Sequence, residues 1–321
     1  MHGFSKGCCA RALRAQAAFT AGIVCTWSLA TAQEPVHTPT RVLPRRGEVR
    51  EGPAASLRTD VNRVLIPVTV TDTYGRQVQG LRKQDFRLLE DGVEQTILEF
   101  FVDEEPLSVG IVLDASNSMT AKIDPAKQAI SAFLRLSAPE DEFFLVTVQD
   151  RPELVRGFTG DPAEIEHEMA GVHAQGWTAL YDGMYLGINH LKRSIHSRRA
   201  LVVLTDGGDN NSRYTESEMR TLVRESDARI FSISVLGRSP AMEKLAEESG
   251  GQAFHIHKLS ELSDLGAALN AVIHDEYVLG FSPANHVRDG KYHTTRVEIV
   301  QPTDGSRFHA TWRHGYFAPF Q

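Results

Sequence analysis

Three oxygen-bearing side chains follow one apolar segment at alternating positions. The segment LSVGIVL, residues 107–113, is almost continuously apolar, as expected of a strand buried on both faces of a parallel sheet. Asp114, Ser116 and Ser118 come directly after it. Such side chains either cap a helix or bind a hard cation such as Mg²⁺. Other parts of the chain decide between these two interpretations.

Two further segments place oxygen donors at the same kind of position. The strand-like segment ALVVLT, residues 200–205, is followed by Asp206 and the flexible stretch GGDNNS. The loop AQGWT places Thr178 just before a predicted helix. Ligands of a doubly wound sheet bind outside the carboxyl ends of its strands. We therefore expect five oxygen-bearing side chains from three loops at one edge of the sheet.

These five side chains are all hard oxygen donors, without imidazole or thiolate. That ligand set suits Mg²⁺, Mn²⁺ or Ca²⁺ rather than zinc. Two carboxylates balance a divalent charge and leave the ion able to accept one more anionic ligand. Taken singly, Ser116, Ser118 and Thr178 are ordinary capping hydroxyls and Asp206 an ordinary turn residue. Their joint order and strand context favour a metal site.

The same residues resemble a known family. Asp114-x-Ser116-x-Ser118, Thr178 in GWTALYDG and Asp206 in LTDGGDN are similar to the metal-ion-dependent adhesion site of von Willebrand factor type A domains, integrin I domains included. The resemblance covers roughly residues 106–275. The flanking motifs GLRKQDFRLLEDG, YVLGFSP and RHGYFAP are similar to secreted bacterial proteins related to this family and typical of acidobacteria.

The resemblance implies a role for each residue. Ser116 and Ser118 would bind Mg²⁺ directly, and Thr178 would do so in the ligand-competent state. Asp114 and Asp206 would bind it directly or through water. A water molecule or a glutamate or aspartate of a protein partner would take the sixth position. The last helix of the domain, residues 262–273, would be able to couple its position to ligand binding.

Trp177 lies beside Thr178 and leaves two interpretations open. A bulky aromatic side chain in a loop at the expected edge either covers the site or contacts the ligand.

From Leu107 onward, strand-like and helix-like segments alternate, which predicts a doubly wound, mostly parallel α/β sheet. Three helix starts carry recognisable signals. Asp124 is expected to cap a helix whose first residue is Pro125. Capping boxes are expected at two further helices. They pair Asp161 with Glu164 and Thr215 with Glu218.

Two β-rich segments flank the α/β segment, residues 60–105 before it and 276–321 after it. Neither is large enough to hold a stable sandwich alone. We expect them to pair into one small β-sandwich into which the α/β domain, residues 106–275, is inserted. The alternative is that each segment adds edge strands to the α/β domain or packs on it.

The N-terminal residues resemble an export signal. Residues 1–32 contain a basic start, a short apolar run and a small-x-small ending at Ala32, after which we expect cleavage. A lipoprotein signal at Cys25 fits poorly, because Gly22-Ile23-Val24 precedes it. Residues 33–59 are rich in proline, arginine and small residues and predict a flexible linker. We therefore expect a secreted or periplasmic protein without a membrane span in the mature chain.

The cysteine content and the net charge of the chain argue against several classes of function. All three cysteines lie within residues 1–32, so cleavage would leave neither disulfides nor cysteine nucleophiles. It would also remove three positive charges and no negative one, taking the formal charge from −7 to −10. An acidic chain without a basic run argues against nucleic acids and anionic membranes as partners.

The sequence thus predicts a secreted, non-enzymatic binding module that uses a divalent cation to hold an aspartate or glutamate carboxylate of a protein partner. Two alternatives remain. One is a metal-assisted hydrolase, which lacks a candidate general base near the expected edge. The other is a structural interaction protein whose metal site is not functional.

Overall fold

The computed structural model describes residues 63–283, 289–300 and 307–319. The predicted signal, residues 1–32, and the predicted linker, residues 33–59, lie outside the described residues. Across the described ranges, no helix combines the length and the apolar composition needed to span a membrane.

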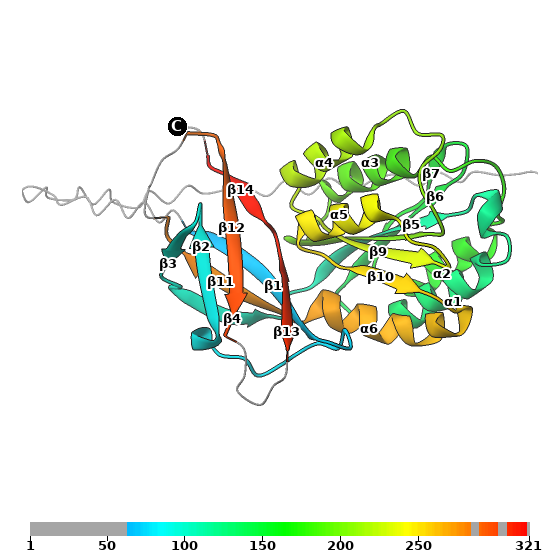
Figure 1. Ribbon diagram of the computed structural model, residues 1–321. Helices are drawn as coiled ribbons and strands as arrows, with labels where there is room; N and C mark the ends of the chain where they lie inside the picture. Colours follow the sequence, from blue (N-terminus) through cyan, green and yellow to red (C-terminus); the bar gives the residue numbers. More distant parts are fainter. Residues whose placement is uncertain (1–62, 284–288, 301–306, 320–321) are drawn as a thin grey trace, which may run out of the picture. The chain divides into compact units, whose positions relative to one another are not determined.

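A six-stranded sheet in the order β10-β9-β8-β5-β6-β7 organises the middle of the chain (Figure 1). Its neighbouring strands are parallel except at one edge, where β7 runs antiparallel to β6. The strands are β5 (Leu107–Asp114), β6 (Glu142–Val148), β7 (Pro152–Thr159), β8 (Arg198–Thr205), β9 (Arg229–Val235) and β10 (Ala253–Ile256). The prediction of a mostly parallel α/β sheet is confirmed.

Three helices cover each face of this sheet (Figure 1). One face carries α1 (Ile123–Leu134), α2 (Pro162–Ala170) and α6 (Leu262–His274). The other carries α3 (Leu180–Leu191), α4 (Glu216–Glu225) and α5 (Pro240–Ser249). Short 3-10 turns precede two of these helices, η2 (Asn117–Met119) before α1 and η3 (Leu259–Glu261) before α6. A further one, η1 (Lys83–Asp85), lies in the segment before β5.

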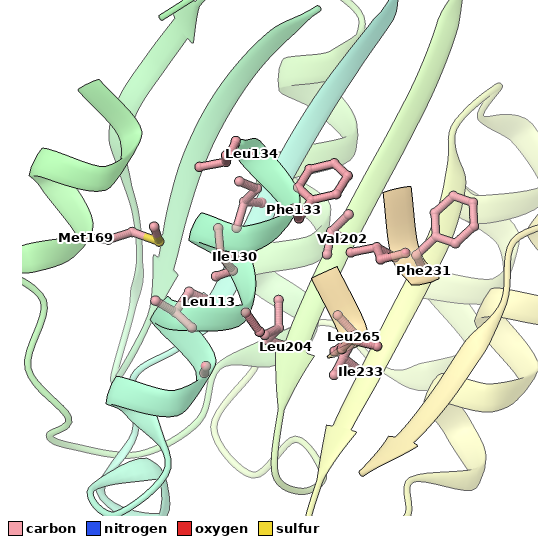
Figure 2. Packing of buried hydrophobic residues seen from close by; sticks show 14 of the residues in the cluster. Leu113, Ile130, Phe133, Leu134, Met169, Val202, Leu204, Phe231, Ile233 and Leu265 are labelled. Carbon is pink, nitrogen blue, oxygen red and sulfur yellow. The ribbon is translucent and has the colours of Figure 1, made fainter. Parts of the chain in front are cut away.

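The strands are apolar on both faces because each face has its own helical cover. In β8, Val202 and Leu204 pack with the α1 and α6 side, whereas Leu201 and Val203 pack with the α3 side. Figure 2 shows side chains of α1, α2 and α6 over residues of β5, β8 and β9. This packing fixes the carboxyl ends of β5 and β8 beside each other, which positions the loops that follow them.

Two four-stranded antiparallel sheets are built from the flanking segments. The first, in the order β13-β1-β11-β4, contains β13 (Phe308–Trp312), β1 (Val64–Asp72), β11 (Glu276–Phe281) and β4 (Glu99–Asp103). The second, in the order β14-β12-β2-β3, contains β14 (Gly315–Phe317), β12 (Tyr292–Ile299), β2 (Phe86–Glu90) and β3 (Val93–Gln95).

The two sheets share one apolar core, which includes Val68 and Leu88 from before the α/β segment and Leu279 and Val297 from after it. Strand β1 pairs with both β11 and β13, so the early and late segments also hydrogen bond directly. The small β-sandwich expected from the sequence is therefore present.

Of the two predicted capping boxes, one forms. At the start of α4, Thr215 Oγ1 accepts a hydrogen bond from Glu218 N, and Thr215 N donates the reciprocal bond to Glu218 Oε2. At α2, Asp161 caps the helix by accepting from Ala163 N at 2.9 Å. Glu164 instead contacts Thr159 and Arg156 of the preceding strand. The second box was wrong because a cation and a hydroxyl on β7 compete for the glutamate.

The start of α1 also differs from the prediction. The helix begins at Ile123, and Lys122 occupies its N-cap position without a side-chain capping bond. Asp124 lies inside the first turn rather than before it. The preceding turn η2 explains the shift, because Lys122 N donates to Met119 O at 2.7 Å and carries the chain into the helix without a break.

Candidate metal centre

Asp114 is the last residue of β5 and is fully buried. Its Oδ1 atom accepts a hydrogen bond from Ser116 N at 2.9 Å, and its Oδ2 atom accepts one from Thr205 Oγ1 at 2.7 Å. Burial raises the pKa of the Asp114 carboxyl, these hydrogen bonds lower it in part, and the nearby charge of Asp206 adds to the rise. The carboxylate is thus fixed in place in a setting where a cation would stabilise its charged form.

A continuous set of contacts leads from this strand end to the next. Ser116 Oγ lies 3.1 Å from Ser118 Oγ, and Ser118 Oγ donates to Asp206 Oδ1 at 2.8 Å. Ser116 stands at the N-cap position of η2, but its side chain makes no capping hydrogen bond. The two serine hydroxyls therefore face each other, and that of Ser118 also contacts Asp206. Four of the five predicted site residues, Asp114 included, are brought together by these contacts and by the Ser116 N bond to Asp114.

Thr178, the fifth predicted residue, is tied to the same loops through the backbone. Thr178 O accepts from Asn210 N and Asn211 N, both at 3.1 Å, and Thr178 N donates to Asn210 Oδ1 at 2.9 Å. These asparagines belong to the loop that begins at Asp206. The N-cap of α3 is Ala179 and not Thr178, so the threonine hydroxyl does not cap that helix.

The loop before Thr178 depends on a glycine. Gly176 has a φ of +75°, and a Cβ atom on it would lie 2.8 Å from Asp150 Oδ1. Its carbonyl accepts from Asn117 N at 3.1 Å, which ties this loop to the one that follows β5. Asp150 Oδ1 in turn accepts from Trp177 N at 2.8 Å. Trp177 keeps 65 % of its surface exposed, so its side chain is not part of the core.

Close packing of α3 on the sheet helps to position the loop that carries Thr178. A Cβ atom on Gly183 would lie 2.3 Å from Val148 Cγ2, and one on Gly187 would lie 2.7 Å from Leu201 Cδ1. The two glycines therefore let the helix approach the strands closely. This close approach fixes the position of the N-terminal end of α3 and of Thr178, which precedes the helix.

A hollow of about 690 Å³ lies next to this loop. Two residues of its wall contact this loop, because Asn211 N donates to Thr178 O and Asp150 Oδ1 accepts from Trp177 N. The residues that line it are Asp150, Arg151, Pro152, Asp182, Tyr185, Leu186, Asn211 and Arg213. Arg213 donates to the buried carboxylate of Asp182 from Nε at 3.0 Å, whereas Arg151 is exposed.

Sequence reasoning missed one member of the site. Lys122 Nζ lies 2.5 Å from Asp206 Oδ2, the oxygen that Ser118 does not contact. Lys122 follows Ser118 by four residues, and the turn η2 between them brings the amine back towards the site. A cation one turn after the last serine of the motif is the signal that could have revealed it.

The donor set fits a hard divalent cation. It consists of carboxylate and hydroxyl oxygens, and burial raises the pKa of the Asp114 carboxyl, so a bound cation would stabilise its charged form. Over the described ranges, no group of three or more histidine, cysteine, aspartate or glutamate side chains could hold a metal ion. A metal at this edge therefore needs the hydroxyls as ligands.

Comparison with known proteins bears on the same region. The family model of the von Willebrand factor type A domain matches residues 109–208, which run from β5 to the loop after β8. The inter-alpha-trypsin inhibitor heavy chain H4 of Homo sapiens is 29 % identical over 174 residues, which cover 49 % of this chain and 19 % of that protein. The corresponding protein of Sus scrofa is 28 % identical over 172 residues, with the same coverage. The chain thus spans about a fifth of the length of these relatives.

Solved structures match this chain at lower sequence identity. A von Willebrand factor type A protein from Catenulispora acidiphila has a TM-score of 0.47 at 14 % identity, covering 75 % of each chain. The proximal thread matrix protein 1 of the mussel byssus, solved with a zinc-occupied metal-ion-dependent adhesion site motif, has a TM-score of 0.47 at 20 % identity, covering 57 % of this chain and 50 % of that one.

Proposed function

The chain contains a von Willebrand factor type A domain, and we propose that this domain uses a divalent cation, Mg²⁺ in the first instance, to hold an aspartate or glutamate carboxylate of a protein partner. The observation that carries the proposal is the chain of contacts from Asp114 through Ser116 and Ser118 to Asp206. These residues and Thr178 are the proposed metal ligands.

The charge of the proposed ligands argues for an acidic partner. The ligand set carries two carboxylates and three neutral hydroxyls, so a bound divalent ion keeps its ability to attract a further anionic oxygen. A carboxylate supplied by a partner completes the coordination and joins the two proteins at the ion. Trp177, exposed beside Thr178, is proposed to contact that partner.

A binding role is favoured over catalysis by the neighbours of the proposed ligands. Within the described part of the chain, the side-chain contacts of Ser118 and Asp206 are with each other, with Ser116 and with Lys122. Neither a histidine nor a glutamate is among them, so a base to activate water is not at hand. The chain's own residues therefore bind and orient, and the ion would supply the attraction for the partner's carboxylate.

We further propose that the protein is exported, with cleavage after Ala32, and that the domain spans residues 106–275. Residues 60–105 and 276–321 then form the β-sandwich, and residues 33–59 form a flexible linker. An N-terminal sequence of the protein recovered from the periplasm or the medium tests the cleavage site.

Calorimetric titration of the EDTA-stripped protein with Mg²⁺, Mn²⁺, Ca²⁺ and Zn²⁺ tests the metal site. We expect binding of the hard ions to the wild type, because oxygen donors prefer them. Ser118→Ala is expected to abolish or strongly weaken this binding without unfolding the protein, because Ser118 is exposed. Asp114→Ala should do the same at some cost in stability. Asp124→Ala is the matched control, since that carboxylate is 81 % exposed on α1.

The same variants test the partner. Immobilised protein is incubated with the native secretome with Mg²⁺ and with EDTA, and bound proteins are identified. Retention that requires Mg²⁺ and is lost in Ser118→Ala supports the proposal. Retention that persists in EDTA contradicts it.

A further inference from the structure

Lys122 is a cation placed inside the candidate metal centre. Its Nζ atom lies 2.5 Å from Asp206 Oδ2, and the two side chains are only 19 % and 5 % exposed. The lysine backbone is held on both sides, because Lys122 N donates to Met119 O at 2.7 Å and Lys122 O accepts from Ala126 N at 3.0 Å. The ammonium group is therefore delivered to the carboxylate by a fixed turn and not by a free surface side chain.

We infer that Lys122 is an internal counter-ion of this centre, which stabilises Asp206 when a metal ion is not bound and competes with a divalent cation for the same carboxylate. The inference rests on the proposed function, since it concerns the affinity of the proposed metal site. It adds a residue that tunes the site without being one of its proposed ligands.

The first argument is the crowding of negative charge. Asp114 and Asp206 are both largely withdrawn from water, and only two serine hydroxyls lie between them along the chain of contacts. Two carboxylates linked by so few contacts repel each other more strongly in a medium of low polarity than they would in water. One positive charge at Asp206 offsets part of that repulsion. The folded protein therefore depends on Lys122 most when it binds no metal.

The second argument is that a bound ion must either displace Lys122 or share Asp206 with it. Displacement breaks a short, partly buried ion pair. Sharing leaves a positive charge within a few ångströms of a doubly positive one. Both routes disfavour the ion, so Lys122 weakens metal binding by either mechanism.

The third argument concerns the state with metal bound. The two carboxylates already balance a divalent ion, so the ammonium group leaves the centre with one positive charge in excess. An anionic group from a partner removes that excess. Lys122 thus makes the loaded site more dependent on a carboxylate from outside than the five proposed ligands alone would.

The test compares the lysine at the N-cap position of α1 with a lysine inside that helix. Lys122→Met removes the internal cation, and Lys122→Gln removes its charge while keeping a hydrogen-bond donor near Asp206. Lys127→Met is the matched control, because Lys127 lies in the first turns of α1, is 15 % exposed and contacts Val172 O and Asp124 instead of the centre. Each variant of the full chain is stripped with EDTA, checked by circular dichroism and titrated with Mg²⁺ by calorimetry.

We expect both Lys122 variants to bind Mg²⁺ about tenfold more tightly than the wild type, with Lys127→Met unchanged. Thermal unfolding supplies a second readout. Without metal, Lys122→Met should have a lower melting temperature than the wild type. Its melting temperature should rise more on adding Mg²⁺, since a tighter ligand stabilises the native state more at equal concentration.

Equal or weaker Mg²⁺ binding by both Lys122 variants, with a measurable wild-type affinity, overturns the inference and leaves the proposed metal site standing. Weaker binding would assign Lys122 the opposite role of orienting Asp206 for the ion. If the wild type and every variant fail to bind any of the divalent ions, the proposed function and the inference fall together. Binding by the Lys122 variants alone would support the inference in its strongest form.

Discussion

The carboxylate of Glu276 lies 2.7 Å from Nη1 of Arg229, with the two side chains only 4 % and 8 % exposed. This contact of Glu276 Oε2 does not have the geometry of a hydrogen bond. The two side chains are therefore held together by the attraction of their charges. Arg198 donates to the other oxygen, Oε1, at 3.0 Å. Arg229 also donates to Ile273 O at 2.8 Å, at the end of α6. One glutamate at the start of β11 thus pairs with two buried arginines that begin β8 and β9, and Asp103 Oδ2, 3.6 Å from Arg198 Nε, supplies a second negative charge.

Removing that glutamate should strongly destabilise the protein. Glu276→Ala leaves two buried guanidinium groups without their shared carboxylate, and loss of one partner from a buried ion pair costs about 3–5 kcal/mol. The free energy of unfolding, obtained from urea titration, measures this loss of stability. Glu298→Ala is the control, because its pair with Arg87 is exposed and contributes about 1 kcal/mol or less. Equal losses in the two variants would contradict the role assigned to Glu276.

Gly176 provides a prediction for the metal centre. Gly176→Ala forces a side chain into a φ of +75° and against Asp150, at a cost of about 1–3 kcal/mol. The loop that carries Thr178 must shift, and we expect Mg²⁺ affinity in calorimetry to fall by about fivefold or more. Gly157→Ala is the control, since a Cβ atom there meets nothing within 4 Å. Unchanged affinity in Gly176→Ala would remove Thr178 from the proposed ligands.

The order of strands and helices could be predicted from the sequence because the apolar pattern of each segment indicates how far that segment is buried. Segment 107–113 is apolar throughout and lies in the centre of the sheet, and Pro152–Thr159, which is half-buried, lies at its edge. The meeting of four of the expected side chains could be predicted as well, since parallel strands bring their carboxyl ends to one edge. Here the local pattern and the fold agree.

What the sequence did not reveal depends on contacts between distant residues. Lys122 and Asp206 are 84 positions apart, and nothing in either local pattern indicates that their side chains meet. The capping box at α2 failed for the same reason, because Arg156 on the neighbouring strand takes the carboxylate of Glu164. Local motifs predict what a side chain is able to do, and the fold decides which of its possible partners is present.

His293 gives the β-sandwich a dependence on pH. Its Nδ1 atom lies 2.8 Å from Asp91 Oδ2 and its Nε2 atom 3.4 Å from Asp289 Oδ1. The hydrogen bond to Asp91 raises the pKa of His293 above its ordinary value of 6.5, and Asp289 raises it further. The imidazolium is therefore stabilised in the folded state.

The sign of the effect follows from that shift. The stabilisation is fully present below the unfolded-state pKa and is lost as the pH rises through the higher folded-state pKa. Urea titrations of the wild type and His293→Gln should therefore differ more at about pH 6 than at about pH 9. His309→Gln is the control, because His309 lies on β13 opposite Thr71 of β1 and not beside Asp91 or Asp289. A difference that grows with pH would contradict the assignment.

The substitution Trp177→Ala distinguishes two roles of this side chain, which either covers the metal centre or contacts the partner. Its side chain is 65 % exposed, so Trp177→Ala should change the free energy of unfolding by about 0.5 kcal/mol or less. If it contacts the partner, the same substitution should cost about 1–3 kcal/mol of binding, seen as loss of the Mg²⁺-dependent retention of secretome proteins. Mg²⁺ affinity itself should not change. Tyr74→Ala removes an aromatic side chain that is 81 % exposed on the β-sandwich and serves as the control. A fall in Mg²⁺ affinity or stability with retention intact would instead assign Trp177 to the cover of the site.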